Sequence, residues 1–166
     1  QGMYEKDGKP LTLRFATWGT KTTLYEAIES QLRAGGIDVK MVHVQEPDKV
    51  DEVGGFDLLE EDWSVATTND PYPWLRCMLY SKSGKNTNHS RYASPAFDAI
   101  IDEMATALDP AQKDALVMKA AQQIMEDQPS IFLIVPTTTV VGKSNVKNVK
   151  IFPLYYYLLT KDITVE

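Results

Sequence analysis

The stretch that decides the fold class reads LTLRFATWGTKTTLYEAIESQLRAGGIDVKMVHV, residues 11–44. Its first seven residues place Leu11, Leu13 and Phe15 on one face, which predicts a strand with one buried side. Residues 22–34 then carry apolar side chains at helical spacing and precede two glycines, which predicts a helix and its C-terminal stop. Residues 37–44 alternate again. Strand, helix and strand in this order predict a parallel βαβ crossover and therefore an α/β fold.

Downstream of this unit the sequence predicts a third short strand and a loop. The pair Gly54-Gly55 introduces residues 56–59, which are apolar enough for a short strand. The strand stops at an acidic run, Glu60-Glu61-Asp62, that is followed by Trp63. Residues 64–71 are rich in polar and turn-forming side chains and are predicted to be loop.

The second half of the chain predicts helices and one further strand. Ser94-Pro95 and Asp109-Pro110 each place a capping residue before a proline, and apolar side chains follow at helical spacing. The two helices are expected to pack as a hairpin. Residues 131–135 are a continuous apolar run, which predicts a strand buried on both faces. Residues 149–159 are rich in aromatic side chains, so we expect this tail to be covered by protein.

Composition limits the classes of function. The chain has 166 residues, 43% of them hydrophobic, and carries a net charge of -6, which fits one compact domain. No basic stretch is present to neutralise a phosphate backbone, so nucleic acid is not an expected partner. No apolar run approaches the roughly 18 residues that span a bilayer. Cys77 is expected to be a buried apolar residue, and the polar opening, residues 4–10, suggests a piece of a longer protein.

The order of these segments resembles that of a known family, extracellular solute-binding protein family 5, whose members include peptide- and nickel-binding components of ABC importers. The resemblance covers nearly the whole chain and rests on an ordered set of segments, each of which also has a structural reason to exist. They are Gly55-Phe56-Asp57-Leu58 leading to Trp63, then Asn69-Asp70-Pro71, Asn88 to Tyr92, Ser94-Pro95-Ala96-Phe97-Asp98, Leu108-Asp109-Pro110, Ala120 to Pro129, and the apolar run after it.

The resemblance implies a periplasmic-binding-protein type II-like fold with two lobes that close on a ligand. Residues 1–150 would be a portion of the C-terminal lobe, with a mixed sheet and flanking helices, and residues 151–166 would return toward the first lobe. The implied function is capture of a small solute, such as a peptide or a nickel chelate, for a membrane permease. The implied location is periplasmic or extracellular, with a possible lipid anchor outside this chain.

Candidate ligand contacts lie in loops that follow strands, because ligands gather at the carboxyl ends of strands in open α/β sheets. Trp18 follows the first strand, and Trp63 opens the loop after the third, although a core tryptophan is the alternative for Trp63. Ala66, Thr67, Thr68 and Asn69 complete that loop. In peptide-binding relatives an aspartate three residues after this tryptophan pairs with the peptide's α-amino group. Ala66 stands there in this chain, which argues against ordinary peptide binding.

Other polar residues leave alternatives open. His89 and Arg91 lie in the loop of residues 84–92 and are candidate ligand contacts, with loop surface as the alternative; His43 is not expected to join His89 in a metal site. Asp70 is expected to cap the helix that follows it, although ligand contact is possible. The acidic run 60–62 can create a field that favours a cationic ligand or be an ordinary solvated face.

Catalysis is not expected, because the sequence contains no nucleophile motif, phosphate-binding loop or metalloprotease motif. No cofactor and no resident metal are predicted. A ligand-sensing or protein-interaction domain of a transcriptional regulator is one alternative function, and a hydrolase domain is another. The upstream sequence would distinguish them, because a secretory signal indicates export and a helix-turn-helix indicates a regulator.

Overall fold

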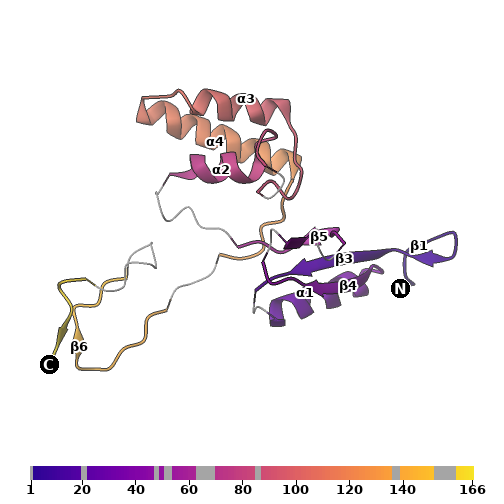
Figure 1. Ribbon diagram of the computed structural model, residues 1–166, viewed down its shortest axis with the longest axis horizontal. Helices are drawn as coiled ribbons and strands as arrows, with labels where there is room; N and C mark the ends of the chain where they lie inside the picture. The colour runs from indigo at the N-terminus through magenta and orange to yellow at the C-terminus, as the bar shows by residue number, and fades with distance from the viewer. Residues whose placement is uncertain are drawn as a thin grey trace. The chain divides into compact units, whose positions relative to one another are not determined.

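The computed structural model describes residues 2–19, 22–46, 49–50, 54–62, 70–84, 87–135, 139–151 and 160–166. The chain divides into two compact units at residues 63 and 64. The first unit contains the predicted βαβ segment, and the second contains three helices, α2, α3 and α4 (Figure 1). None of the helices in these ranges is long and apolar enough to cross a membrane.

A three-stranded parallel sheet forms the centre of the first unit. Strand β3 (Thr12–Thr17) lies between β4 (Asp38–His43) and β5 (Leu58–Leu59) in the order β4-β3-β5. Thr12 pairs with Asp38 and Thr17 with His43, while Phe15 pairs with Leu58. The predicted parallel βαβ crossover and the short third strand are confirmed, and the fold class is α/β.

Helix α1 (Thr22–Ala34) joins β3 to β4 and packs on one face of the sheet (Figure 1). Successive residues of a strand point to opposite faces, so neighbours in β3 enter different cores. Phe15 packs edge-on against Tyr25 of α1, with ring centroids 6.0 Å apart. Ala16 joins Val44 and Val50 in a second cluster, to which Trp18, Phe56 and Leu59 add partly buried side chains. Both faces of the sheet are therefore covered by apolar side chains.

A glycine turn aligns β5 with β3. Gly54 and Gly55 have φ angles of +86° and +82°, a conformation that side chains with a Cβ rarely adopt. Arg14 Nη1 donates a 2.5 Å hydrogen bond to the carbonyl oxygen of Gly54. The Arg14 backbone N–H donates to the Asp57 carboxylate at 2.7 Å, and the Asp57 N–H donates to the Arg14 carbonyl at 2.9 Å. These bonds fix the register in which β5 joins the sheet.

The three helices of the second unit begin at the residues that the sequence indicates. Helix α2 spans Pro71–Leu79, α3 spans Pro95–Met104, and α4 spans Pro110–Asp127. Asp70, Ser94 and Asp109 are their N-caps, and each side chain accepts a hydrogen bond from a backbone N–H of the first turn. Proline follows each cap, where its missing N–H costs nothing. The predicted pair of helices 95–104 and 110–127 is confirmed.

One apolar core holds the helices together, and Figure 1 shows them stacked side by side. Phe97 and Ala120 are fully buried, and Ile101, Met104 and Leu116 are at most 2% exposed. The core is continuous from α2 through α3 to α4. Cys77 is half-buried against this core rather than fully buried as expected. The helical stripes in the sequence therefore converge on a single cluster.

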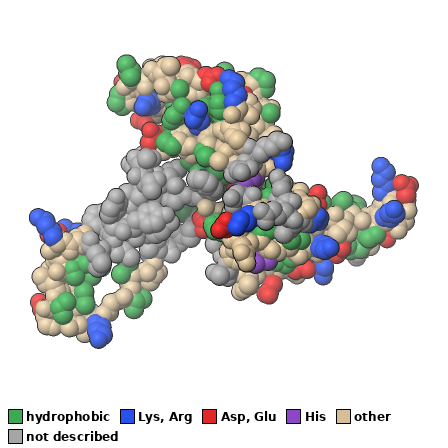
Figure 2. Space-filling model, viewed as in Figure 1, with side chains coloured by type: hydrophobic (Ala, Val, Ile, Leu, Met, Phe, Trp, Pro, Cys, Tyr) green, Lys and Arg blue, Asp and Glu red, His purple; other side chains and the backbone are tan. Residues whose placement is uncertain are grey.

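Two short pairs of antiparallel strands complete the described structure. Strands β1 (Glu5–Lys6) and β2 (Lys9–Pro10) pair with each other, as do β6 (Val146–Lys147) and β7 (Thr164–Val165). The β1–β2 hairpin is exposed, and Figure 2 shows charged side chains of both signs on it.

The prediction of a buried strand at residues 131–135 is wrong for this chain. The segment has no strand pairing in the described structure, and its five apolar side chains are between 55% and 94% exposed. A continuous apolar run is buried only where neighbouring strands and covering elements enclose both of its faces. None of the described strands pairs with it.

Candidate functional site

The carboxyl ends of three parallel strands meet at one edge of the sheet in the first unit. Trp18 directly follows β3, Val44 directly follows β4, and Glu60 directly follows β5. The Val44 N–H donates to the Thr17 carbonyl at 2.8 Å, and the Glu60 N–H donates to the Ala16 carbonyl at 2.9 Å. Backbone hydrogen bonds thus continue one residue past the ends of β4 and β5 and fix the backbone positions of Val44 and Glu60. This edge is where open α/β sheets bind ligands.

Glu60 and Trp18 each place a buried polar atom at this edge, where Thr17 is also buried. Glu60 is only 8% exposed, so the alternative of a solvated acidic face is wrong for this residue. Glu61 is partly exposed and Asp62 is exposed. The indole nitrogen of Trp18 is buried and has no hydrogen-bond partner among the described residues, while its ring packs on the Ala16 cluster. Buried donors without an acceptor are rare in folded proteins.

Most of the predicted ligand loop lies outside the described residues. Trp63, Ala66, Thr67, Thr68 and Asn69 belong to this segment, and their predicted ligand contacts stay predictions. The segment's far end is well defined, because Asp70 accepts a 2.9 Å hydrogen bond from the Tyr72 N–H at the start of α2. The expected capping role of Asp70 is confirmed.

The loop that contains His89 and Arg91 is organised by a buried asparagine that sequence reasoning missed. Asn88 is 5% exposed. Its amide nitrogen donates to the carbonyls of Tyr80 at 3.2 Å and Tyr92 at 2.9 Å, and its oxygen accepts from Ser90 Oγ and the Tyr92 N–H. The sequence feature that could have indicated this role is the short asparagine-rich segment between two tyrosines. Its amide satisfies backbone groups that a surface loop would leave to water.

The two candidates in this loop differ in exposure. His89 is half-buried, whereas Arg91 is exposed and adopts a left-handed backbone with φ of 53°. The Arg91 N–H donates to the Asn88 carbonyl at 3.1 Å, which closes the turn. Among the described residues no three His, Cys, Asp or Glu side chains gather to hold a metal ion.

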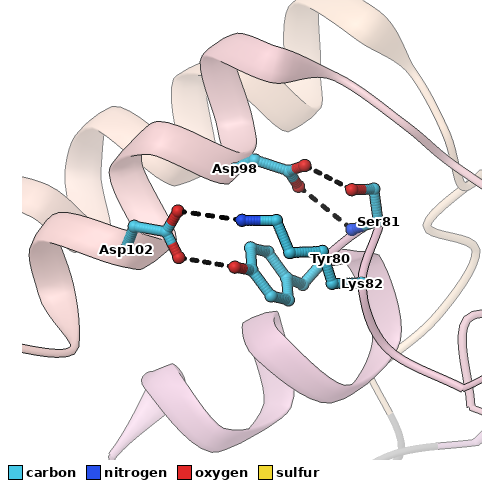
Figure 3. Close-up of polar contacts among 5 residues, drawn as sticks. All are labelled: Tyr80, Ser81, Lys82, Asp98 and Asp102. Carbon is cyan, nitrogen blue, oxygen red and sulfur yellow. Dashed lines mark hydrogen bonds and ion pairs between the residues drawn. The ribbon is translucent and has the colours of Figure 1, made fainter.

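Two aspartates of α3 fix the segment that follows α2 (Figure 3). Tyr80 Oη donates a 2.5 Å hydrogen bond to Asp102, whose other oxygen lies 3.3 Å from Lys82 Nζ. Ser81 donates to Asp98 through both its backbone N–H and its hydroxyl. The Tyr80 hydrogen bond, together with Lys82, lowers the pKa of Asp102, and bonds to Tyr80 and Asp102 raise the pKa of Lys82. These contacts tie α2 to α3.

A similar contact ties the loop to α4. The Tyr92 hydroxyl donates to the carboxylate of Asp127 in the last turn of α4. Burial, followed by this hydrogen bond, raises the pKa of Tyr92 to about 12, and the bond lowers the pKa of Asp127. The ring of Tyr92 also meets Phe97 edge-on, with centroids 5.4 Å apart. The loop is thus attached to the helical core by both a polar and an apolar contact.

A groove of about 470 Å³ lies beside α2 and was not predicted from the sequence. Arg76, Cys77 and Lys82 line it together with Tyr72 and Ser83. Arg76 and Lys82 both lie over the Tyr80 ring, at 5.9 Å and 5.1 Å from its centroid. Lys82 is already paired with Asp102, so the charge of this groove is partly neutralised within the chain.

The arrangement of sheet and helices defines a class of protein. Over 98% of this chain, the fold matches 35% of a nickel ABC transporter structure from Bacillus halodurans, with a TM-score of 0.80 and 23% identity. Over 77% of the chain it matches 26% of the oligopeptide-binding protein AppA from Bacillus subtilis, solved with a nonapeptide, with a TM-score of 0.63 and 26% identity. The fold is that of the type II periplasmic binding proteins, as predicted.

Sequence comparison narrows the class. The chain is 40% identical over 94 residues to the periplasmic oligopeptide-binding protein OppA of Escherichia coli K12, a match that covers 55% of this chain and 17% of OppA. It is 27% identical over 122 residues to the periplasmic murein peptide-binding protein MppA of the same organism, covering 72% of this chain and 22% of MppA. No family model matches the chain. The relatives confirm the predicted resemblance to solute-binding protein family 5, and this chain spans about a fifth of their length.

Proposed function

We propose that this chain is part of the substrate-binding component of an ABC importer, which captures a small solute outside the cytoplasm and delivers it to a membrane permease. The 40% identity to an oligopeptide-binding protein over 94 residues carries this proposal. A peptide is the first candidate solute, because both named sequence relatives bind peptides. A nickel chelate is the second, because the fold match to a nickel transporter structure extends over nearly the whole chain.

In this proposal the chain supplies one wall of the ligand cavity. Residues 1–150 form a portion of one lobe, and residues 151–166 return toward the other lobe. Trp18 and the segment from Trp63 to Asn69 face the solute, with His89 and Arg91 as further contacts. The carboxyl edge of the β4-β3-β5 sheet supports the first of these placements, because Trp18 directly follows its central strand. The location is periplasmic or extracellular, as for OppA and MppA, with a lipid anchor as a further possibility.

The test is a binding measurement on the full-length protein that contains this chain. Tryptophan fluorescence is recorded while tripeptides, or nickel with histidine, are added. We expect saturable binding of one of these solutes and no turnover of any peptide. Peptide cleavage would contradict the proposal and favour the hydrolase alternative, and absence of binding to every solute would also contradict it.

A further inference from the structure

The groove beside α2 lies between one face of that helix and the loop that follows it. Tyr72 and Pro73 come one turn before Arg76 and Cys77, so these four side chains share a face of the helix. Loop residues 82–84 and 87 form the other wall. The volume of about 470 Å³ lies within the range of small-molecule sites. None of the described residues that line the groove carries a carboxylate.

Polar contacts within the chain hold the loop wall against the helix. Ser83 Oγ donates a 2.5 Å hydrogen bond to the carbonyl oxygen of Arg76. The Lys82 side chain extends over the Tyr80 ring to Asp102, as Figure 3 shows. The two walls are therefore positioned by the chain itself, and a ligand would not have to order them, which lowers the free-energy cost of binding.

Arg76 is the cation of this groove that forms no ion pair with a described residue. Lys82 is paired with Asp102 at 3.3 Å, and Asp102 also interacts electrostatically with Arg76 without forming an ion pair. The Arg76 guanidinium lies 5.9 Å from the centroid of the Tyr80 ring and makes no hydrogen bond to any described residue. The Tyr72 hydroxyl makes none within the described chain either. Hydrogen-bond donors of both side chains are thus left for solvent or a ligand.

The chemistry of these donors selects a carboxylate. A guanidinium group is planar, and its fork of N–H groups donates two parallel hydrogen bonds to the two oxygens of a carboxylate. The Lys82 ammonium has three N–H donors, so its contact with Asp102 leaves others for a second acceptor on the opposite wall. The Tyr72 hydroxyl adds an uncharged donor on the helix wall.

The groove begins where the predicted ligand loop ends. Tyr72 comes three residues after Asn69, the last residue of that loop, and its backbone N–H is held by Asp70 at 2.9 Å. Both candidate solutes carry carboxylates, the peptide at its C-terminus and the nickel–histidine complex on its histidine. A carboxylate of either solute therefore matches a groove that adjoins the loop along the chain.

We propose that this groove is a carboxylate subsite, in which Arg76, together with Lys82 and Tyr72, binds a carboxylate of the captured solute. The inference rests on the proposed solute-binding function and adds a subsite and the chemical group that it recognises. The helical unit thereby contributes a positively charged contact of its own to solute capture.

The experiment uses the full-length protein that contains this chain and two peptide mixtures. One mixture consists of tripeptides of neutral residues with free C-termini, and the other consists of the same tripeptides as C-terminal amides, so only the carboxylate differs. The retained fraction of each mixture is measured by mass spectrometry after equilibrium dialysis. Because even a solvent-exposed ion pair can change affinity severalfold, we expect the free acids to be retained about fivefold more strongly than the amides.

The variants locate the preference for the acid. R76Q removes the charge and the fork, and it is expected to abolish the fivefold difference, whereas R76K keeps the charge without the fork and should retain part of it. K119Q removes an exposed cation from α4 in the same unit and should leave the difference unchanged. Thermal unfolding checks that all three variants fold.

Cys77 reports whether the groove is occupied. It lines the groove, and this chain contains one cysteine. Alkylation by N-ethylmaleimide, followed by mass spectrometry of the fragment that contains Cys77, should be slower when the free-acid tripeptides are bound. Should R76Q not fold, the acid-to-amide comparison and this alkylation rate in the wild-type protein decide.

The remaining outcomes separate the inference from the proposed function. Equal retention of acids and amides, an unchanged preference in folded R76Q, or an unchanged rate of Cys77 alkylation with peptide bound overturns the subsite while solute capture stands. If the protein binds nickel–histidine and no peptide, R76Q should weaken that binding about fivefold, and an unchanged affinity overturns the subsite. Absence of binding to all of these probes overturns the proposed function together with the inference.

Discussion

The two compact units of the chain are built on opposite plans. In the first, a thin parallel sheet separates two small apolar clusters, one around Phe15 and one around Ala16. In the second, three helices share one larger continuous core. The sheet leaves a buried carboxylate at its carboxyl edge, whereas the helical unit buries an asparagine, Asn88, whose amide satisfies backbone groups.

The difference assigns separate tasks to the two units. A parallel sheet brings the ends of distant segments to one edge, which is suited to assembling a ligand contact from short loops. A helical core is suited to holding a loop in place, and the residues after α2 are attached to it through Asp98, Asp102 and Asp127. We expect recognition at the sheet edge to depend on the strands and loop geometry in the second unit to depend on the helices. Substitutions in the helical unit test this separation.

Phe97→Ala is expected to have the largest effect. Phe97 is 0% exposed and central to the helical core, and truncating a buried phenylalanine costs about 3–5 kcal/mol. Amide hydrogen exchange should accelerate throughout α2, α3 and α4 while the β3–β4 amides keep their protection. The control is Met118→Ala on the exposed face of α4, 69% exposed, which should change stability by less than about 0.5 kcal/mol. Equal acceleration in the sheet would show that the units unfold together and would contradict the separation.

Asn88→Ala is expected to act more locally. It removes the donor to two backbone carbonyls and the acceptor for the Tyr92 N–H in a buried position, a loss of about 1–3 kcal/mol. Exchange of the loop amides from Ser90 to Tyr92 should rise more than that of α4. Asn145→Ala is the matched control, because Asn145 is exposed and donates one bond to the Glu166 carbonyl. Equal effects of the two substitutions would show that burial of Asn88 contributes nothing.

Much of the fold can be predicted because local signals and tertiary structure agree. The alternation around Phe15, the glycine pair after α1 and the Ser-Pro and Asp-Pro starts each have a local physical cause that the structure preserves. Residues 131–135 show the limit of such reasoning. Their apolar run specifies a preference for burial, but a sequence pattern does not say which surface would cover it.

The candidate site can be predicted only in part. The rule that ligands lie at the carboxyl ends of parallel strands selects Trp18 correctly as a strand-end residue, because the strands themselves are recognisable. The burial of Glu60 could not be predicted, since one residue of an acidic run looks the same in sequence whether it faces water or the sheet. Asn88 was missed for a related reason, because its partners are backbone groups that no sequence motif marks.

The smallest expected effect belongs to the polar contacts on the surface of the helical unit, and it depends on pH. Asp102 has a lowered pKa in the folded protein, first through the Tyr80 hydrogen bond and then through Lys82. A lowered folded pKa means that the contribution to stability is fully present above the unfolded value of about 4 and is lost as the pH falls through the folded value. Asp102→Asn should therefore lower the melting temperature slightly at pH 7, and the difference from wild type should shrink toward pH 2.

The control is Asp114→Asn, a change at an exposed position on α4. Its difference in melting temperature from wild type should stay small at every pH. A deficit of Asp102→Asn that persists unchanged at pH 2 would mean that the charge of the carboxylate contributes nothing and that the Tyr80 hydrogen bond to a neutral carboxyl group suffices to hold the segment after α2.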